Sequence, residues 1–415
     1  MTRTELLCLI IYFASTTCEN VRFDNYRVYR IWIQNPGHLE ILQELENYQD
    51  GLSFLEAPFP SSETVEIVVP PHHFEHLTEL FEKYEMKFVI KISNLQSLID
   101  NEQPKVFASE ATFGWKKYHD LTEIYEWLDE ILEKFPVLSN YNFGTSYEGR
   151  PMRAVKISHK ANNPTIFIES TIHGREWITA ATATYLLNEL LTSTEPEVIE
   201  LAQNFDWVFV PVFNVDGYAY THHHNRIWRK TRQPNANLDI CIGVDLNRNF
   251  DFNHLSQGSS KNPCSAIYAG PEPFSTPEAL ALSEFVKSFD NLKMYLSFQS
   301  YRQRLLFPYG TLLWEHTENY KDMNQIAHKA KEAISQRFGT EYSVGSAAEA
   351  DHEASGTSID WVHAKLNVSL AFAIIFRDKG EAGFILPSNQ IIPNALETFD
   401  GLKAMLKEAQ ILNYF

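Results

Sequence analysis

The chain has 415 residues, of which 44% are hydrophobic and 21% charged, so it is long enough for two globular domains and a large core. Its formal net charge of −18 argues against binding to nucleic acid or to anionic membrane surfaces, because both need a basic face. We therefore expect neither of these partners.

The first residues have the pattern of a secretory signal peptide. Arg3 supplies a positive charge and an apolar stretch follows at residues 6–14, so we predict a signal peptide over residues 1–18 that is cleaved after Cys18. The apolar stretch is too short to span a bilayer, and no later segment reaches the necessary length. These features predict a secreted, extracellular protein without a membrane span.

Residues 22–100 alternate between strand and helix patterns. Strands are predicted at 27–33, 64–69 and 87–92, and amphipathic helices at 38–48 and 73–84. This order is typical of a small α+β, ferredoxin-like module, to which we assign residues 19–105. The polar stretch 100–110 contains Pro104 and has the composition of a linker, which trypsin-like enzymes should cut at Lys105.

The second unit, residues 106–415, has the pattern of an α/β domain. It opens with a predicted helix from Leu121 to Leu132, which ends before Pro136. Later segments are apolar on both faces, as strands covered by helices should be. These predicted strands are 165–169, 207–213, 296–299 and 370–376. We expect a mixed, mostly parallel sheet with helices on both faces.

A candidate site follows from the strand ends. In α/β sheets ligands bind beyond the carboxyl ends of strands, and His173, Gln299 and Ile375 fall near such ends. His173 and Glu176 stand in the run STIHGREWI (170–178), where an imidazole and a carboxylate three residues apart can reach one tetrahedral metal ion. An isolated pair of this kind fits ordinary surface chemistry equally well, because a catalytic zinc ion needs a third protein ligand.

Four cysteines are present. Cys8 and Cys18 lie in the predicted signal peptide, which leaves Cys241 and Cys264 in the mature chain. In an oxidising compartment such a pair is most simply one disulfide, and two buried thiols are the alternative.

Several further motifs accompany His173 and Glu176 in a fixed order. They are NVDG (214–217), NRIWRKTR (225–232), GVDLNRN (243–249), SY (300–301), PYG (308–310), ASGTSIDW (354–361) and FRD (376–378). Together they closely resemble the carboxypeptidase A/B subfamily of zinc metallocarboxypeptidases. The resemblance covers nearly the whole chain. It implies an activation segment before a peptidase domain.

The resemblance also implies roles for individual residues. His173 and Glu176 match the first two zinc ligands, and Asp245 matches the carboxylate that orients the histidine. The cations that face the substrate carbonyl are matched by Arg229 and Arg175. The resemblance implies that the protein binds peptide C-termini. Asn247 and Arg248 match the grip on the terminal carboxylate, Tyr301 a subsite aromatic, and Ile359 the base of a pocket that suits apolar side chains.

Three departures from the family pattern bear on function. Gln299 stands where the third zinc ligand, a histidine, is expected; Ile375 stands at the catalytic glutamate; and His352 replaces a mobile tyrosine that covers the substrate. An aliphatic side chain cannot act as a general base, and an amide is a weaker zinc ligand than an imidazole. His352 is the alternative source of a third ligand.

Three functions are therefore weighed. The first is a catalytically inactive or severely impaired protein that still binds peptide C-termini, with zinc bound weakly or not at all. The second is a working zinc carboxypeptidase of A-like specificity. The third is an interaction protein, such as a decoy for carboxypeptidase inhibitors. In each case we expect a monomer.

Overall fold

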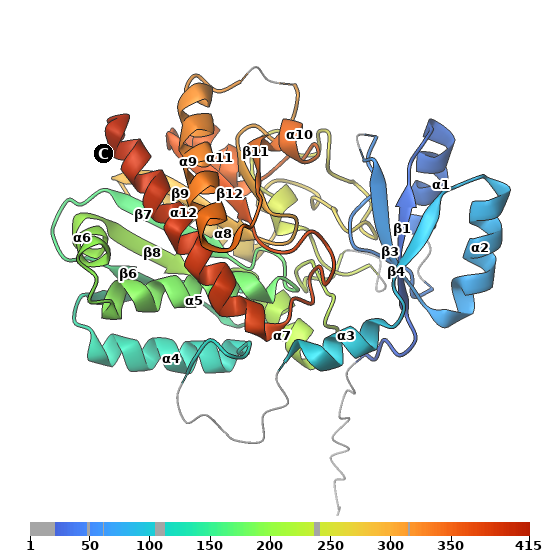
Figure 1. Cartoon of the computed structure of the whole chain (residues 1–415), viewed down its shortest axis with the longest axis horizontal. Helices are drawn as coiled ribbons and strands as arrows, with labels where there is room; N and C mark the ends of the chain where they lie inside the picture. The colour runs from blue at the N-terminus through green and yellow to red at the C-terminus, as the bar shows by residue number, and fades with distance from the viewer. Residues whose placement is uncertain (1–20, 48–49, 61, 104–112, 236–240, 314–315) are drawn as a thin grey trace, which may run out of the picture.

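The computed structural model describes residues 21–47, 50–60, 62–103, 113–235, 241–313 and 316–415. The predicted signal peptide, the predicted boundary at residues 105 and 106, and Lys105 lie outside the described residues. Two units are visible, each built around its own sheet (Figure 1). We refer to residues 21–103 as the N-terminal module and to residues 113–415 as the C-terminal domain.

The N-terminal module has the order of elements of a split βαβ fold. Its elements are β1 (Arg27–Trp32), α1 (Pro36–Glu46), β2 (Ser53–Phe54), β3 (Thr64–Val69), the 3-10 turn η1 (Pro71–His73), α2 (Phe74–Lys83), β4 (Phe88–Ile92) and α3 (Leu95–Glu102). The sheet has the order β2-β3-β1-β4 with antiparallel pairs throughout. Helices α1 and α2 cover the face that is turned away from the C-terminal domain (Figure 1).

The module differs from the sequence prediction at element boundaries and in two elements that were not predicted, β2 and α3. Helix α1 starts two residues earlier than predicted, because the Asn35 side chain accepts a hydrogen bond from the His38 backbone and Pro36 suits a first turn. Strand β2 was not predicted, since two residues are too few to show a period. The predicted linker start at residue 100 is wrong, because α3 continues to Glu102.

The C-terminal domain surrounds an eight-stranded mixed sheet of order β11-β10-β12-β9-β7-β8-β6-β5. Its strands are β5 (Leu138–Thr145), β6 (Pro151–Ile157), β7 (Thr165–Ser170), β8 (Asp206–Val210), β9 (Leu292–Gln299), β10 (Arg304–Phe307), β11 (Ser343–Ser346) and β12 (Leu370–Ile375). The four central strands, β12-β9-β7-β8, run parallel. They are buried throughout most of their length, as the apolar pattern predicted.

Helices cover both faces of this sheet (Figure 1). The helical elements of this domain are α4 (Leu121–Lys134), α5 (Trp177–Thr192), α6 (Pro196–Asn204), α7 (Val215–His223), the 3-10 turn η2 (Leu246–Arg248), α8 (Pro277–Lys287), α9 (Tyr320–Phe338), α10 (Ala347–Ala350), α11 (Ser358–Leu366), the 3-10 turn η3 (Ser388–Gln390) and α12 (Ile391–Ile411). The predicted strand 207–213 instead ends at Val210, because Pro211 has no N–H for the ladder. Among the described helices, none combines the length and apolar character needed to cross a membrane.

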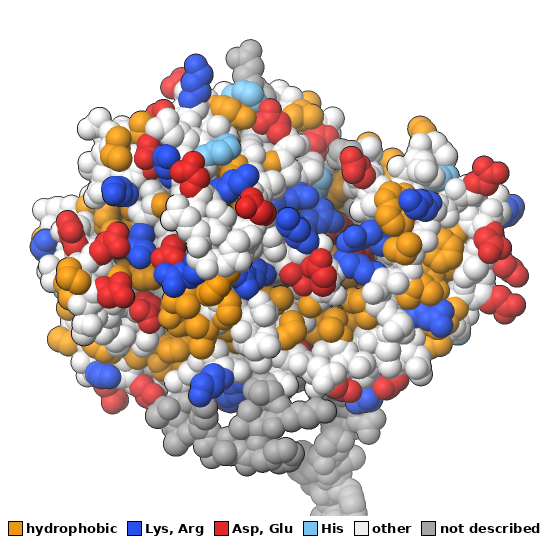
Figure 2. All heavy atoms as spheres, viewed as in Figure 1, with side chains coloured by type: hydrophobic (Ala, Val, Ile, Leu, Met, Phe, Trp, Pro, Cys, Tyr) orange, Lys and Arg blue, Asp and Glu red, His pale blue; other side chains and the backbone are white. Residues whose placement is uncertain are grey.

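The two units pack through an apolar cluster with charged pairs around it. Val28 and Leu55 of the module join Ile227, Tyr301 and Phe384 of the C-terminal domain in one buried cluster. Basic side chains gather where the two units meet on the face shown in Figure 2. The ion pairs between the two units include Arg226–Glu102 and Arg302–Glu56.

Candidate functional site

The candidate site lies at the carboxyl ends of the central strands. His173 follows β7, and Glu176 immediately precedes α5. Gln299 is the last residue of β9 and Ile375 the last residue of β12, and these two are register partners in the parallel ladder. Parallel pairing therefore brings side chains from distant parts of the sequence to one edge of the sheet.

His173 and Glu176 are buried and oriented toward each other. Nδ1 of His173 lies 2.7 Å from Oε1 of Glu176, and its Nε2 lies 3.0 Å from Oδ1 of Asp245. The second oxygen of Glu176 accepts a hydrogen bond of 3.1 Å from the Ser300 backbone. A carboxylate behind the imidazole fixes the ring, so that Nδ1 and Glu176 face a common point, as two ligands of one metal ion do.

Asp245 joins the histidine to the cations of the site. Its Oδ2 accepts a hydrogen bond of 2.9 Å from Nη2 of Arg229, and its Oδ1 accepts one of 3.0 Å from the Asn247 backbone. Burial alone would raise the pKa of Asp245, but Arg229 and His173 hold it well below its usual range. Asp245 is therefore a fixed negative charge that orients both His173 and Arg229.

Gln299, which the family resemblance places at the third-ligand position, presents an amide at the end of β9. Its Nε2 donates a hydrogen bond of 2.9 Å to Oγ of Ser297 on the same strand. The alternative ligand, His352, stacks on Phe59 with ring centroids 5.0 Å apart, and its Nδ1 lies 2.9 Å from Oδ1 of Asp351. The donors present thus fit two of the three protein ligands of a tetrahedral zinc ion, and they do not complete the set.

A cavity of about 100 Å³ opens beside these residues. The predicted residues that line it are His173, Glu176, Arg229, Asn247, Arg248, Gln299, Tyr301, His352, Ile359 and Ile375. Its apolar lining also includes Leu306, Ala347, Ala354 and Ala373. The structure therefore brings together the residues predicted for metal and substrate, whereas Arg175 and Asp245 lie behind the lining.

Asn247 and Arg248 are held firmly at the cavity wall. Nε of Arg248 donates to the Gly258 carbonyl at 2.7 Å, and its Nη1 donates to the Asn247 carbonyl at 2.8 Å. Oδ1 of Asn247 accepts a hydrogen bond of 3.1 Å from the Ser358 backbone. Burial lowers the pKa of Arg248 to about 10, so the guanidinium remains cationic at neutral pH.

Residues of the N-terminal module reach the same cavity, which the sequence analysis did not predict. Leu55 and Glu56 line it. The Leu55 carbonyl accepts a hydrogen bond of 2.6 Å from Nη2 of Arg175, and Glu56 pairs with Arg302. Arg175, whose pKa is lowered to about 9 by burial, is therefore directed at the module in this structure.

Glu66 makes a second contact between the N-terminal module and the site that the sequence analysis did not predict. It is buried in β3, and its Oε2 accepts a hydrogen bond of 2.8 Å from the Tyr301 hydroxyl. Its Oε1 lies 2.6 Å from both Arg30 Nη2 and Lys91 Nζ. The signal available in the sequence was a single carboxylate inside the apolar strand TVEIVV (64–69), since buried acids need partners.

Family signatures match both units of the chain. The signature described as "Zinc carboxypeptidase" matches residues 124–401, and that described as "Carboxypeptidase activation peptide" matches residues 29–102. A relative from Anopheles gambiae, "Zinc carboxypeptidase A 1", is 39% identical over 413 residues, which cover 98% of this chain and 95% of the relative.

Solved structures agree with this relationship. The crystal structure of thrombin activatable fibrinolysis inhibitor (TAFI) has a TM-score of 0.85 at 27% identity and covers 93% of this chain and 98% of its own. Bovine thrombin-activatable fibrinolysis inhibitor, in complex with tick carboxypeptidase inhibitor, has a TM-score of 0.67 at 31% identity over 72% of this chain and 99% of its own. The chain belongs to the zinc carboxypeptidase family, and its N-terminal module is a carboxypeptidase activation peptide.

Cys241 and Cys264 form a disulfide with a Cα–Cα distance of 4.7 Å. The enclosed segment contains Asp245, Asn247 and Arg248. Replacing both cysteines by serine should lower the free energy of unfolding by about 2–4 kcal/mol, because the unfolded chain gains freedom. Thermal unfolding of the two proteins measures this change. Peptide mapping without reductant that finds two free thiols in the unaltered protein would contradict it.

Proposed function

We propose that this chain is a secreted carboxypeptidase-like protein that binds peptide C-termini carrying an apolar side chain and hydrolyses them very slowly or not at all. The observation that carries the proposal is the pairing of Ile375 with Gln299 at the cavity. One strand end lacks the carboxylate base and the other lacks the imidazole ligand. The cationic grip on a terminal carboxylate is retained beside them.

Retained binding rests on Arg248, Asn247 and Arg229. A guanidinium presents a planar fork that suits a carboxylate, and charge-assisted hydrogen bonds contribute about 1.5–3 kcal/mol each. The small and aliphatic residues of the cavity, such as Ile359 and Ala373, offer no partner for a charged terminal side chain. They favour peptides that end in Phe or Leu.

Loss of turnover rests on the absence of an available carboxylate base among the described residues that line the cavity. The carboxylates that line the cavity are Glu56, Glu176 and Asp351. Glu176 is bonded to His173, Asp351 is paired with Arg304 and Arg302, and Glu56 is paired with Arg302. None takes the place of a base at position 375, and such a loss typically costs about 10²–10⁴-fold in rate.

Two further carboxylates, the buried Glu169 and the half-buried Asp378, are also poor substitutes. Glu169 in β7 is fully buried, and burial raises its pKa to about 8, but it does not line the cavity. Asp378 accepts hydrogen bonds from the backbones of Gly380, Ala382 and Gly383. Glu169 is thus enclosed in the protein, and the carboxylate of Asp378 is engaged by backbone N–H groups.

The binding proposal is tested by comparing a peptide that ends in Phe with the same peptide as its C-terminal amide. Calorimetry on the protein freed of its activation peptide should show binding of the acid and at least tenfold weaker binding of the amide. Equal binding of both would mean that the carboxylate grip is not used. That result would favour a second candidate, docking of a carboxypeptidase inhibitor, for which the complex of the bovine relative is the precedent.

Secretion and processing complete the proposal. The signal-like N-terminus, the activation peptide match and the disulfide support an extracellular location. Limited trypsin treatment should cut first at Lys105, because this polar stretch with its proline lies between two folded units. N-terminal sequencing should then find a fragment that starts at residue 106. A first cut inside residues 22–100, or well beyond Lys117, would count against the assignment of the two units.

A further inference from the structure

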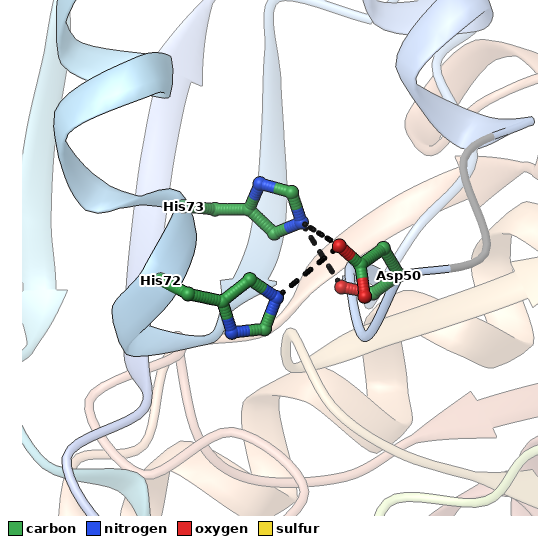
Figure 3. Close-up of side chains that lie close together, drawn as sticks. All are labelled: Asp50, His72 and His73. Carbon is green, nitrogen blue, oxygen red and sulfur yellow. Dashed lines mark hydrogen bonds and ion pairs between the residues drawn. The ribbon is translucent and has the colours of Figure 1, made fainter.

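A cluster of potential metal ligands lies in the activation peptide, away from the cavity. Asp50 belongs to the loop between α1 and β2, and His72 and His73 belong to η1 at the start of α2. The two imidazole rings point at the same carboxylate (Figure 3). Among the described residues, this is the one group of three or more His, Cys, Asp or Glu side chains whose ligand atoms converge.

The separations in this cluster match those of ligands around an ion. Nε2 of His72 and Nε2 of His73 lie 3.4 and 3.3 Å from the same oxygen, Oδ2 of Asp50. These distances exceed the usual range of an N–H···O hydrogen bond. A tetrahedral zinc ion with nitrogen and oxygen ligands at about 2.0–2.1 Å would hold its ligand atoms about 3.4 Å apart. The two nitrogen–oxygen separations therefore match edges of such a site, and all three ligand atoms lie within 4.8 Å of one another.

The cluster is also open to an incoming ion. The Asp50 and His72 side chains are 71% and 55% exposed, whereas His73 is 14% exposed. Nε2 of His73 also donates a hydrogen bond of 3.0 Å to the Asp50 carbonyl oxygen, so without an ion it carries a proton that the metal ion must displace. Asp50 and His72 can thus be approached from solvent, and water can complete the coordination.

We propose that Asp50, His72 and His73 form a binding site for a divalent cation of the zinc class. Imidazole nitrogens suit zinc-class metals, and the mixed set of two imidazoles and one carboxylate occurs in zinc sites. Calcium and magnesium prefer sites made of oxygen ligands. Binding displaces the proton from whichever Nε2 carries it, because an imidazole must be unprotonated at the ligating atom.

The position of the site gives it a structural consequence. Asp50 lies a few residues before β2, which leads directly to Leu55 and Glu56 at the cavity. A bound ion joins Asp50, which precedes β2, to His72 and His73, which follow β3. It therefore restrains both ends of the chain segment that carries Leu55 and Glu56. The site is independent of His173 and Glu176, and it leaves with the activation peptide when that peptide is removed.

The test is a titration of Zn²⁺ into the full, metal-stripped chain carrying His173→Ala, which removes the His173–Glu176 ligand pair from the cavity. Calorimetry and equilibrium dialysis should find one zinc ion bound. His72→Ala and Asp50→Ala, each added to this background, should weaken binding more than about tenfold, since even partners that only orient a ligand cost 10–100-fold. His76→Ala is the matched control, because His76 is an exposed histidine on α2 outside the cluster.

Two results would overturn the proposal. One is the absence of zinc binding by the full chain with His173→Ala. The other is that the His72→Ala and Asp50→Ala variants bind zinc as tightly as the His76→Ala control does. Asp50, His72 and His76 are exposed but His173 is buried, so circular dichroism and thermal unfolding verify that each variant, including the His173→Ala background, is folded.

Discussion

Restoring both altered positions, with Gln299→His and Ile375→Glu together, should raise the hydrolysis of a peptide ending in Phe by about 10²–10⁴-fold. The two side chains are register partners at neighbouring strand ends, so the new imidazole and carboxylate would face the same cavity. The histidine completes three protein ligands for zinc, and the glutamate supplies a proton acceptor. The rate is measured on protein freed of its activation peptide, with zinc present.

Two partial variants separate these contributions. Gln299→His alone should raise zinc affinity at least tenfold but recover little turnover. The second variant combines Gln299→His with Ile375→Gln, which places at position 375 a side chain of similar size to glutamate but without a carboxylate. Its hydrolysis of the peptide should be as slow as that of Gln299→His alone. A folded double variant that binds zinc tightly and still leaves the peptide intact would contradict the assignment of position 375 to the base.

Replacing Arg248 by alanine should abolish measurable binding of the peptide acid. Two charge-assisted hydrogen bonds to a carboxylate would account for about 3–6 kcal/mol, at 1.5–3 kcal/mol each, which is more than a hundredfold in affinity. Arg248→Lys keeps the charge but loses the planar fork. Its affinity for the acid should therefore fall between those of the unaltered protein and Arg248→Ala. Calorimetry with the acid measures all three proteins.

The amide of the same peptide is the control for Arg248→Ala. Its weak binding should not change further, because the amide has no terminal charge for Arg248 to meet. Arg248 also donates to the carbonyls of Gly258 and Asn247, so thermal unfolding must verify that the variant is folded. Unchanged binding of the acid to a folded Arg248→Ala protein would remove the carboxylate grip from the account.

Local sequence patterns predicted the parts of the fold that depend on neighbouring residues. The apolar run at 370–376 predicted β12, and the three-residue spacing of His173 and Glu176 predicted that both could face one point. The predictions failed where a single residue sets an element boundary. Asn35 starts α1 earlier than its apolar period does, and Pro211 stops β8 while the apolar pattern continues.

The contacts between the two units could not be predicted from local sequence patterns. Leu55 meets Arg175, and Glu56 meets Arg302, across more than a hundred residues of sequence. Nothing in either local segment specifies its partner, because the contacts arise only when the two folded surfaces dock. The family resemblance named residues of the cavity, but the stacking of His352 on Phe59 required the structure.

The measurement that tests the central claim most directly is the turnover of the unaltered protein. The protein is freed of its activation peptide, supplied with zinc and incubated with peptides ending in Phe or Leu, with and without a chelator. We expect no significant release of the terminal residue in either condition, because Ile375 cannot accept a proton and Gln299 leaves the ligand set incomplete. Release at a rate typical of enzymes, on the order of 1–10³ s⁻¹, that the chelator stops would contradict this account and make the chain a working zinc carboxypeptidase.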